Sequence, residues 1–250
     1  MIDDTLKAGG RDPLLDAALG PAMLHQTTHG SQNGPETLRI YRPRPTLGFS
    51  GRDAASPGIA KAVAAARSMG FDPVRRGPGG RAAAYHQGAL CLDHVGGDDP
   101  GPQQIRSRFL GFGELLTGAL RKVGVNAELG PVPGEYCPGE FSVNDGRGHK
   151  LIGTAQRLVR GGWLFGTVIL VTDPEPVRHV LTKVYDALGL DWEPSTVGAI
   201  ETTVPGITVD DIKSAVLEAY AGLGQVIRGD LTNEVLELAT IRIGRHRLPI

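Results

Sequence analysis

The sequence predicts an α+β fold, with a mixed and largely antiparallel sheet flanked by helices. Segments with strand-like and helical patterns follow one another without the regular strand–helix alternation of a doubly wound sheet. Three strand-like segments follow in succession, at residues 141–144, 150–159 and 163–171. Gly161-Gly162 separates the last two, which is typical of an antiparallel hairpin. These observations favour a sheet in which most neighbouring strands run in opposite directions.

Apolar residues at helical spacing predict five helices around this sheet. They cover residues 13–24, 58–69, 104–123 and 174–188, and a segment that begins at 208. Gly70 follows the second helix, where a glycine commonly ends one, and Asp173 is the expected N-cap of the fourth. Thr208 and Asp211 resemble a capping box with aspartate in place of glutamate.

Four further strands are expected before the long third helix, at residues 38–41, 73–76, 81–86 and 90–95. Residues 230–240 are compatible with either a helix or an edge strand. We expect a catalytic domain over residues 1–203. The remaining segment, residues 204–250, is expected to be helical and to pack on the same domain.

Composition excludes several classes of protein. The 26 lysines and arginines are balanced by 27 aspartates and glutamates, so no overall charge favours nucleic acid or an anionic membrane. No apolar run is long enough to cross a membrane, and the N-terminus has no secretory pattern, so we expect a cytoplasmic protein. Cys91 and Cys137 are then expected to be reduced thiols, with Cys91 in a buried strand.

The first segment that could carry chemistry runs from Arg75 to Leu90 and contains Gly-Pro-Gly-Gly followed by three alanines. Glycines allow a ligand to lie directly against the backbone, and arginines can hold a carboxylate, phosphate or carbonyl. A tight hairpin with surface arginines is an alternative interpretation of the same residues. The segment lacks the Gly-Lys-Ser/Thr of a phosphate-binding loop and the spacing of a dinucleotide fingerprint.

The second segment places Cys137 between Tyr136 and Pro138 in a loop rich in glycine and proline, followed by Lys150 at the start of a strand. A thiolate in such a loop could be a nucleophile. Taken alone, the cysteine could equally be incidental, and a lysine at a strand end is usually a solvated charge. His86 and His149 lie beside these two segments, and neither pairs with another histidine or a carboxylate at metal-ligand spacing, so we expect no metal.

Together and in this order, the two segments resemble the lipoate/octanoate attachment family of lipoate–protein ligases and octanoyltransferases, with biotin–protein ligases as more distant members. Arg75-Arg-Gly-Pro-Gly-Gly-Arg-Ala-Ala-Ala-Tyr-His86 looks like the family's Arg-Arg-x-x-Gly-Gly-Gly-x-x-x-x-His loop and strand. Lys150-Leu-Ile-Gly-Thr-Ala-Gln156 looks like its Lys-x-x-Gly-x-(Ala/Ser)-Gln motif. The resemblance implies a fold like that of class II aminoacyl-tRNA synthetases and biotin–lipoate ligases.

The segment around Tyr136-Cys-Pro-Gly139 is most similar to the branch that moves octanoyl from the glycine-cleavage H protein to other proteins. The resemblance implies that Cys137 is the nucleophile and that Lys150 favours the thiolate and donates to the developing oxyanion. It also implies a substrate-binding set around an apolar tunnel: Arg75, Arg76, Gly79, Gly80, Arg81, Ala82, Ala83, Ala84, His86, Gly153 and Ala155. Arg81 stands where the family has its third glycine, which would change the shape or charge of the acyl pocket.

The function implied is transfer of an octanoyl or lipoyl group through a Cys137 thioester to a lysine of a lipoyl domain in the E2 subunit of a 2-oxoacid dehydrogenase. The donor would be the glycine-cleavage H protein or an acyl carrier protein, and His86 is a possible general base. Transfer would require no cofactor. One alternative is an ATP-dependent lipoate–protein ligase, with ATP and Mg²⁺, in which Lys150 and Arg76 contact an acyl-adenylate. Another is a non-catalytic acyl-binding protein.

Overall fold

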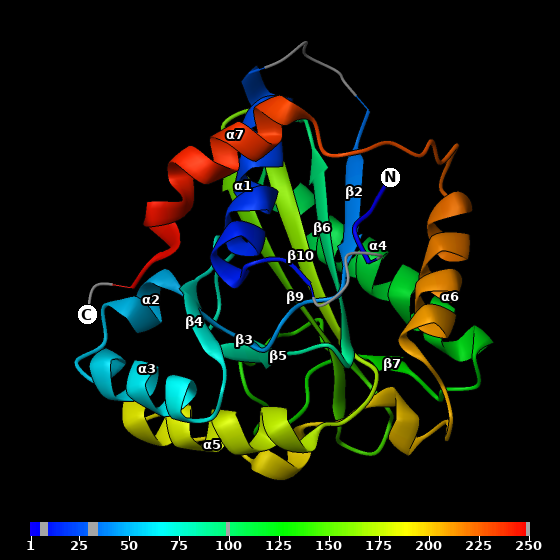
Figure 1. Cartoon of the computed structure of the whole chain (residues 1–250). Coiled ribbons are helices and arrows are strands. Elements are labelled where there is room, and N and C mark those ends of the chain that lie inside the picture. Colours follow the sequence, from blue (N-terminus) through cyan, green and yellow to red (C-terminus); the bar gives the residue numbers. More distant parts are fainter. Residues whose placement is uncertain (6–9, 30–34, 99–100, 249–250) are drawn as a thin grey trace.

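The chain, described by a computed structural model over residues 1–5, 10–29, 35–98 and 101–248, contains a long twisted sheet and a smaller one (Figure 1). The long sheet has the order β1-β2-β6-β10-β9-β8-β7, and all its neighbours are antiparallel except β1 and β2. Its strands are β1 (Ile2–Asp3), β2 (Thr37–Tyr41), β6 (Ala89–Gly96), β7 (Glu128–Leu129), β8 (Val143–Asn144), β9 (Lys150–Val159) and β10 (Gly162–Leu170). The predicted α+β fold is confirmed.

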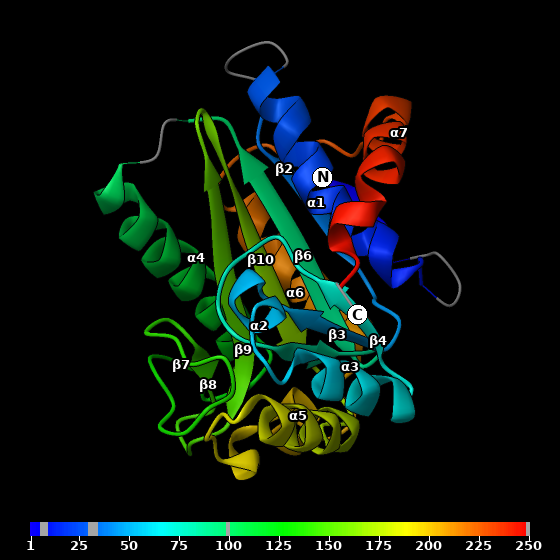
Figure 2. The ribbon, with the colours of Figure 1, turned by 90° about the vertical axis from the view of Figure 1, so that its left-hand side faces the viewer.

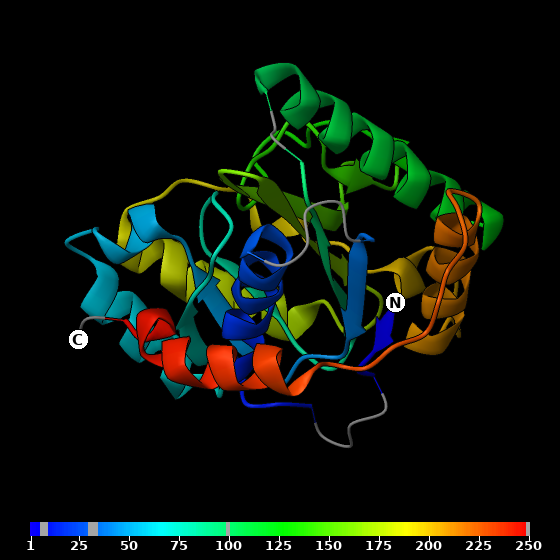
Figure 3. The same ribbon diagram turned by 90° about the horizontal axis from the view of Figure 1, so that it is seen from above.

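Helices cover both faces of the long sheet. Figure 2 shows α4 (Pro102–Lys122) on one side of the long strands, with α1 (Pro13–His29) and α7 (Asn233–Arg242) on the other. Viewed from above, α6 (Val209–Ala221) lies next to α4 (Figure 3). The Thr208–Asp211 capping box is present at the start of α6, as predicted. None of the helices in the described residues is long and apolar enough to cross a membrane.

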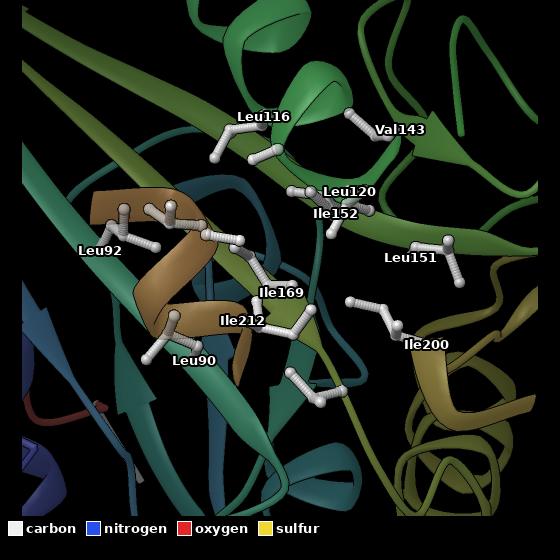
Figure 4. Packing of buried hydrophobic residues seen from close by; sticks show 14 of the residues in the cluster. Leu90, Leu92, Leu116, Leu120, Val143, Leu151, Ile152, Ile169, Ile200 and Ile212 are labelled. Carbon is white, nitrogen blue, oxygen red and sulfur yellow. The ribbon is translucent and has the colours of Figure 1, made fainter. Parts of the chain in front are cut away.

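The largest apolar core lies between the long sheet and the helices α4 and α6. Leu116 and Leu120 of α4 and Ile212 of α6 pack on Ile152 and Ile169 of the sheet (Figure 4). Helix α1 packs on the other face of the long sheet, and α7 packs on α1 through Val235 and Ala239. Residues 233–242 are therefore helical, and the edge-strand alternative for this segment is wrong.

The smaller sheet has the order β4-β3-β5 and lies at one end of the long sheet (Figure 1). It is made of β3 (Thr46–Phe49), β4 (Asp72–Arg75) and β5 (Ala83–Tyr85). A second core joins it to α3 (Ile59–Ser68) and α5 (Glu175–Leu188), while the short helix α2 (Gly51–Ala54) follows β3. The described part of the chain also has three short 3₁₀ helices: η1 (Pro194–Thr196), η2 (Ile200–Thr202) and η3 (Ile243–His246).

Two local expectations differ from the structure. Helix α5 begins after Pro174, which caps it without a side-chain hydrogen bond, so Asp173 is not the N-cap. Asp173 instead has a positive φ of 56°, and its carbonyl accepts a hydrogen bond from His86. Helix α1 runs past Pro21 to His29, five residues beyond the predicted end.

A buried ion cluster joins the N-terminal strand, α1 and the long sheet. The guanidinium of Arg39, which is fully buried, contacts the carboxylates of Asp4, Asp16 and Asp93. Burial raises the pKa of Asp93 to about 6, and Asp16 adds to this shift, whereas Arg39 opposes it. Burial also raises the pKa of Asp16, so the cluster holds two carboxyl groups that are harder to ionise in the folded chain than in the unfolded one.

We expect Asp93→Asn to remove a pH dependence of stability that the wild-type chain carries. A carboxyl whose folded pKa is raised stabilises the fold when protonated, and this contribution is lost as pH rises from about 4 to 6. Relative to the variant, the wild-type free energy of unfolding should fall by roughly 2–3 kcal/mol over this interval. Urea unfolding of both proteins between pH 4 and 7.5 measures the difference, and parallel profiles would contradict it.

Candidate active site

The sulfur of Cys137 lies where the loop between β7 and β8 meets the loop between β4 and β5. Arg76 Nη2 lies 3.4 Å from Cys137 Sγ, and the backbone N–H of Arg81 donates to the same atom across 3.2 Å. The same Arg76 nitrogen also donates to the carbonyl of Arg81. Cys137 is partly exposed, whereas Cys91 is buried, and burial raises the pKa of the Cys91 thiol well above its ordinary value. The structure thus offers one accessible thiol, next to a guanidinium.

Cys137 has an unusual backbone conformation, with φ of 43°. This left-handed region is unfavourable for a residue other than glycine, so surrounding contacts must hold it. The N–H of Cys137 donates to the hydroxyl of Tyr185 on α5 at 2.7 Å, and that hydroxyl donates to the carbonyl of Ala82 at 3.0 Å. Tyr185 therefore ties the cysteine loop to the strand that follows Arg81.

Lys150, the first residue of β9, fixes the same loop from the other side. Its buried ammonium donates to the carbonyls of Tyr136 and Cys137, at 3.1 and 3.0 Å, and lies 2.9 Å from the carboxylate of Glu135. These three partners match the three N–H bonds of a lysine. In this arrangement Lys150 positions the cysteine backbone, while the cation next to the sulfur is Arg76.

Glu135 is itself held by the loop. Its two oxygens accept from the hydroxyl of Ser142 at 2.7 Å and from the backbone N–H groups of Gly139 and Val132. A buried ion pair is stable only where the remaining lone pairs are satisfied, and here they are. Glu135 was not among the predicted functional residues, although it lies two residues before Cys137.

A pocket extends from Cys137 across the face of the long sheet. Its floor crosses β9, β10 and β6, where Ala155 pairs with Gly166 and Gly166 with Asp93. Gly153 and Gly166 have no side chains on this face, and the side chains of Lys150 and Pro78 approach the sheet there: a Cβ would lie 3.2 Å from Lys150 Cε at Gly153 and 3.4 Å from Pro78 Cγ at Gly166. Helix α1 covers the pocket through Ala17 and Pro21. The space not filled by atoms is about 820 Å³, including the open mouth.

The two ends of the pocket differ in chemistry. One end is lined by Cys137, Lys150 and Arg76. The other end, where β6 and β2 meet α1, is lined by Asp16, Asp93 and Tyr41. The carboxylates belong to the Arg39 cluster, so the far wall is polar and tied together by ion pairs. An apolar chain entering from Cys137 would meet this wall after crossing three strands.

The structure brings seven of the predicted site residues to this pocket: Arg76, Ala83, Ala84, Cys137, Lys150, Gly153 and Ala155. Gly80 lies against the sulfur without lining the pocket, since a Cβ added there would be 2.6 Å from Cys137 Sγ. Ala82 is buried outside the pocket lining, and its carbonyl accepts a hydrogen bond from the hydroxyl of Tyr185. Arg75 and Gly79 are exposed and lie outside the pocket lining.

Two predicted residues have different surroundings from those expected. His86 is buried outside the pocket lining, where Nδ1 accepts from the N–H of Gly88 and Nε2 therefore donates to the carbonyl of Asp173. Both ring nitrogens are engaged, which argues against the general-base role. Arg81 directs its guanidinium to the buried carboxylate of Asp53, 3.2 Å away, and does not line the pocket.

Tyr185, Glu135 and Gly166 are the functional residues that sequence reasoning missed. Tyr185 has the helical spacing of a core residue, and its partner Ala82 is 103 positions away in the chain. Gly166 could have been found as a glycine inside a strand, which often marks a close approach of a ligand or backbone.

Comparison with known proteins identifies the family. Residues 12–221 match the model of the lipoyl protein ligase A/B catalytic domain, so the chain belongs to that family. The predicted resemblance to the lipoate attachment family is thereby confirmed. Helix α7 and η3 lie beyond the matched region.

Similar curated proteins include octanoyltransferases. An octanoyl-[GcvH]:protein N-octanoyltransferase from Geobacillus kaustophilus is 27% identical over 185 residues, which cover 72% of this chain and 64% of that protein. The protein of the same name from Bacillus velezensis is 24% identical over 213 residues, 85% of this chain and 70% of that one. The chain thus spans slightly less than two thirds of the first of these relatives.

Solved structures share the fold. A putative lipoate protein ligase from T. acidophilum with bound lipoic acid superposes with a TM-score of 0.75 at 19% identity, covering 98% of this chain and 94% of that one. Lipoate-protein ligase A bound with ATP gives a TM-score of 0.76 at 19% identity, with coverage of 94% and 90%.

We expect Gly80→Ala to lower the reactivity of the Cys137 thiol. Gly80 has φ of 101°, and a Cβ there would lie 2.6 Å from both Cys137 Sγ and Arg76 Nη2. Gly79→Ala is the matched control, since a Cβ at Gly79 meets no atom within 4 Å. The rate of Cys137 alkylation by iodoacetamide, followed by mass spectrometry, should fall at least tenfold in the first variant. It should stay within twofold in the second, and equal rates in all three proteins would refute this view of the site.

We expect Lys150→Met to destabilise the fold, because it leaves Glu135 buried without its cation. Removing one partner of a buried pair costs roughly 3–5 kcal/mol. Adding Glu135→Gln should restore most of the free energy of unfolding. The rate of Cys137 alkylation in the double variant should still differ from that of wild type, because the carbonyl of Cys137 still lacks the lysine donor. If the single variant unfolds at the same urea concentration as wild type, Lys150 does not have this structural role.

Proposed function

We propose that this protein is an acyltransferase of lipoate metabolism, in which an octanoyl group passes through a thioester on Cys137. The observation that carries the proposal is the position of Cys137 Sγ, in contact with Arg76 and the N–H of Arg81 at one end of the pocket. The curated relatives named octanoyl-[GcvH]:protein N-octanoyltransferase support this activity. The donor is an acylated carrier protein, the glycine-cleavage H protein or an acyl carrier protein. The acceptor is a lysine of the lipoyl domain of a 2-oxoacid dehydrogenase E2 subunit.

The acyl chain lies on the sheet between Cys137 and the polar wall of Asp16 and Asp93. Burial of apolar carbon contributes about 0.8 kcal/mol per CH₂, so an eight-carbon chain contributes roughly 5 kcal/mol. Longer chains would press against buried carboxyl groups held by Arg39, which cannot be displaced without breaking ion pairs. The wall therefore sets an upper limit on chain length, while the apolar floor disfavours short chains.

Two acyl exchanges complete the reaction. In the first exchange, the sulfur of Cys137 attacks the acyl carbonyl carbon of the donor and a C–S bond forms. The bond from this carbon to the donor's heteroatom breaks, and the heteroatom takes up the proton of the thiol. An acceptor lysine amine then attacks the thioester, the C–N bond forms, and the sulfur leaves and recovers a proton from the amine. Neither step consumes ATP or another cofactor.

Arg76 is the group best placed to assist both exchanges. Its Nη2 lies next to the sulfur, and its Nε is buried with no hydrogen-bond partner among the described residues. A buried donor without a partner is costly unless a ligand completes it. The carbonyl oxygen of the bound acyl group, which becomes an oxyanion during attack, is the partner we assign to this guanidinium.

Mixing the protein with octanoyl-H protein in the absence of ATP should produce a mass increase of one octanoyl group, which hydroxylamine removes. Cys137→Ala should show no increase, because it lacks the sulfur, while Cys91→Ala, at the buried cysteine, should acylate as wild type does. Intact-protein mass spectrometry measures all three. Acylation that appears only with octanoate and ATP would favour the ligase, and octanoate binding without transfer would favour the acyl-binding protein.

A further inference from the structure

A wide groove next to the acyl pocket is lined by an unusual concentration of positive charge. The lining includes six arginines, from four separate parts of the fold: Arg75, Arg76, Arg157, Arg160, Arg242 and Arg245. Among the residues that the structure describes, Asp98 is the one acidic residue of the lining, and it is paired with Arg108. Because the chain as a whole has a formal charge of −1, this groove does not reflect the average surface.

The groove is continuous with the active site. Arg76, Gly77 and Pro21 line both the groove and the acyl pocket. Arg76 therefore has the sulfur of Cys137 on one side and the arginine groove on the other. A molecule seated in the groove would reach the mouth of the pocket without leaving the positively charged surface.

The C-terminal segment builds one wall of the groove. Arg242 ends α7, and Arg245 and His246 lie in η3. His246 is buried and its Nδ1 lies 2.8 Å from the carbonyl of Arg75, which anchors this wall to β4. These residues are outside the pocket of Cys137, so the reaction chemistry leaves them without a role.

The size and exposure of the groove indicate a macromolecular ligand. It encloses about 2500 Å³ with its open side, roughly three times the space of the acyl pocket. Arg75, Arg157, Arg160 and Arg245 are exposed rather than gathered around one buried point. Such an array matches an extended acidic surface better than a single small anion.

We propose that the groove is the docking surface for the carrier domains, and that it recognises an acidic protein face beside the acyl-bearing lysine or prosthetic arm. This inference rests on the proposed function. Because one cysteine accepts the acyl group from the donor and returns it to the acceptor, both domains must approach the same mouth. The same groove therefore serves both partners, and the α7–η3 segment is part of their binding site.

The test reverses two groove charges that lie outside the catalytic machinery, in the variant Arg160→Glu/Arg245→Glu. Its matched control is Lys61→Glu/Arg67→Glu on α3, where both residues are exposed and the change in net charge is the same. At low ionic strength the groove variant should lower kcat/KM at least tenfold for the octanoyl-carrier donor and for the lipoyl-domain acceptor. The control should stay within twofold, and the groove variant should show a weaker dependence on salt than wild type.

A small thioester, octanoyl-N-acetylcysteamine, separates this proposal from the proposed function. It needs no docking surface, so wild type, groove variant and control should all acylate Cys137 from it at similar rates. If wild type is not acylated by either donor, the proposed function fails. If the small thioester acylates Cys137 and the groove variant still uses both carriers as well as wild type does, the docking surface is overturned. Equal losses in the groove variant and the control would also overturn it.

Discussion

The constraint on which the site depends is the left-handed backbone of Cys137, a conformation that costs a non-glycine residue about 1–2 kcal/mol. Three residues maintain it: Tyr185 of α5 accepts the cysteine N–H, Lys150 of β9 donates to its carbonyl, and Glu135 forms an ion pair with the lysine. The conformation brings the sulfur to the N–H of Arg81 and the guanidinium of Arg76. The long sheet and the small sheet are therefore both needed to present one thiol.

The same sheet that supplies Lys150 also forms the floor of the pocket that we propose for the acyl chain. Gly153 and Gly166 add no side chains to the pocket floor on β9 and β10, and α1 closes the pocket from above. The pocket ends at carboxyl groups that Arg39 holds in place, so one ion cluster both fastens α1 to the sheet and limits the depth of the pocket. Under the proposed function, Asp16 and Asp93 would couple the stability of the fold to the selection of acyl-chain length.

Periodicity and turn chemistry predicted much of the fold, because the β9–β10 hairpin and the helices α3, α4 and α5 have strong local patterns. Residues 46–54 were missed, since β3 and α2 are four residues long and depend on contacts with β4 and β5. In the site, the motifs identified Cys137, Arg76 and Lys150. The structure adds that Arg76 contacts the sulfur of Cys137, whereas Lys150 donates to backbone carbonyls of the cysteine loop. Tyr185 and the Arg39 cluster could not be predicted, because long-range contacts alone distinguish them from ordinary core residues.

The central claim is that a thioester on Cys137 is an intermediate and not a side product. The most direct test is to isolate the octanoylated protein, free of donor and ATP, and to mix it with an excess of unmodified lipoyl domain in a rapid-quench experiment. The account predicts that the octanoyl group moves to the acceptor lysine in a single turnover, at a rate no slower than steady-state transfer. Loss of the group to water, with an unmodified acceptor, would contradict it.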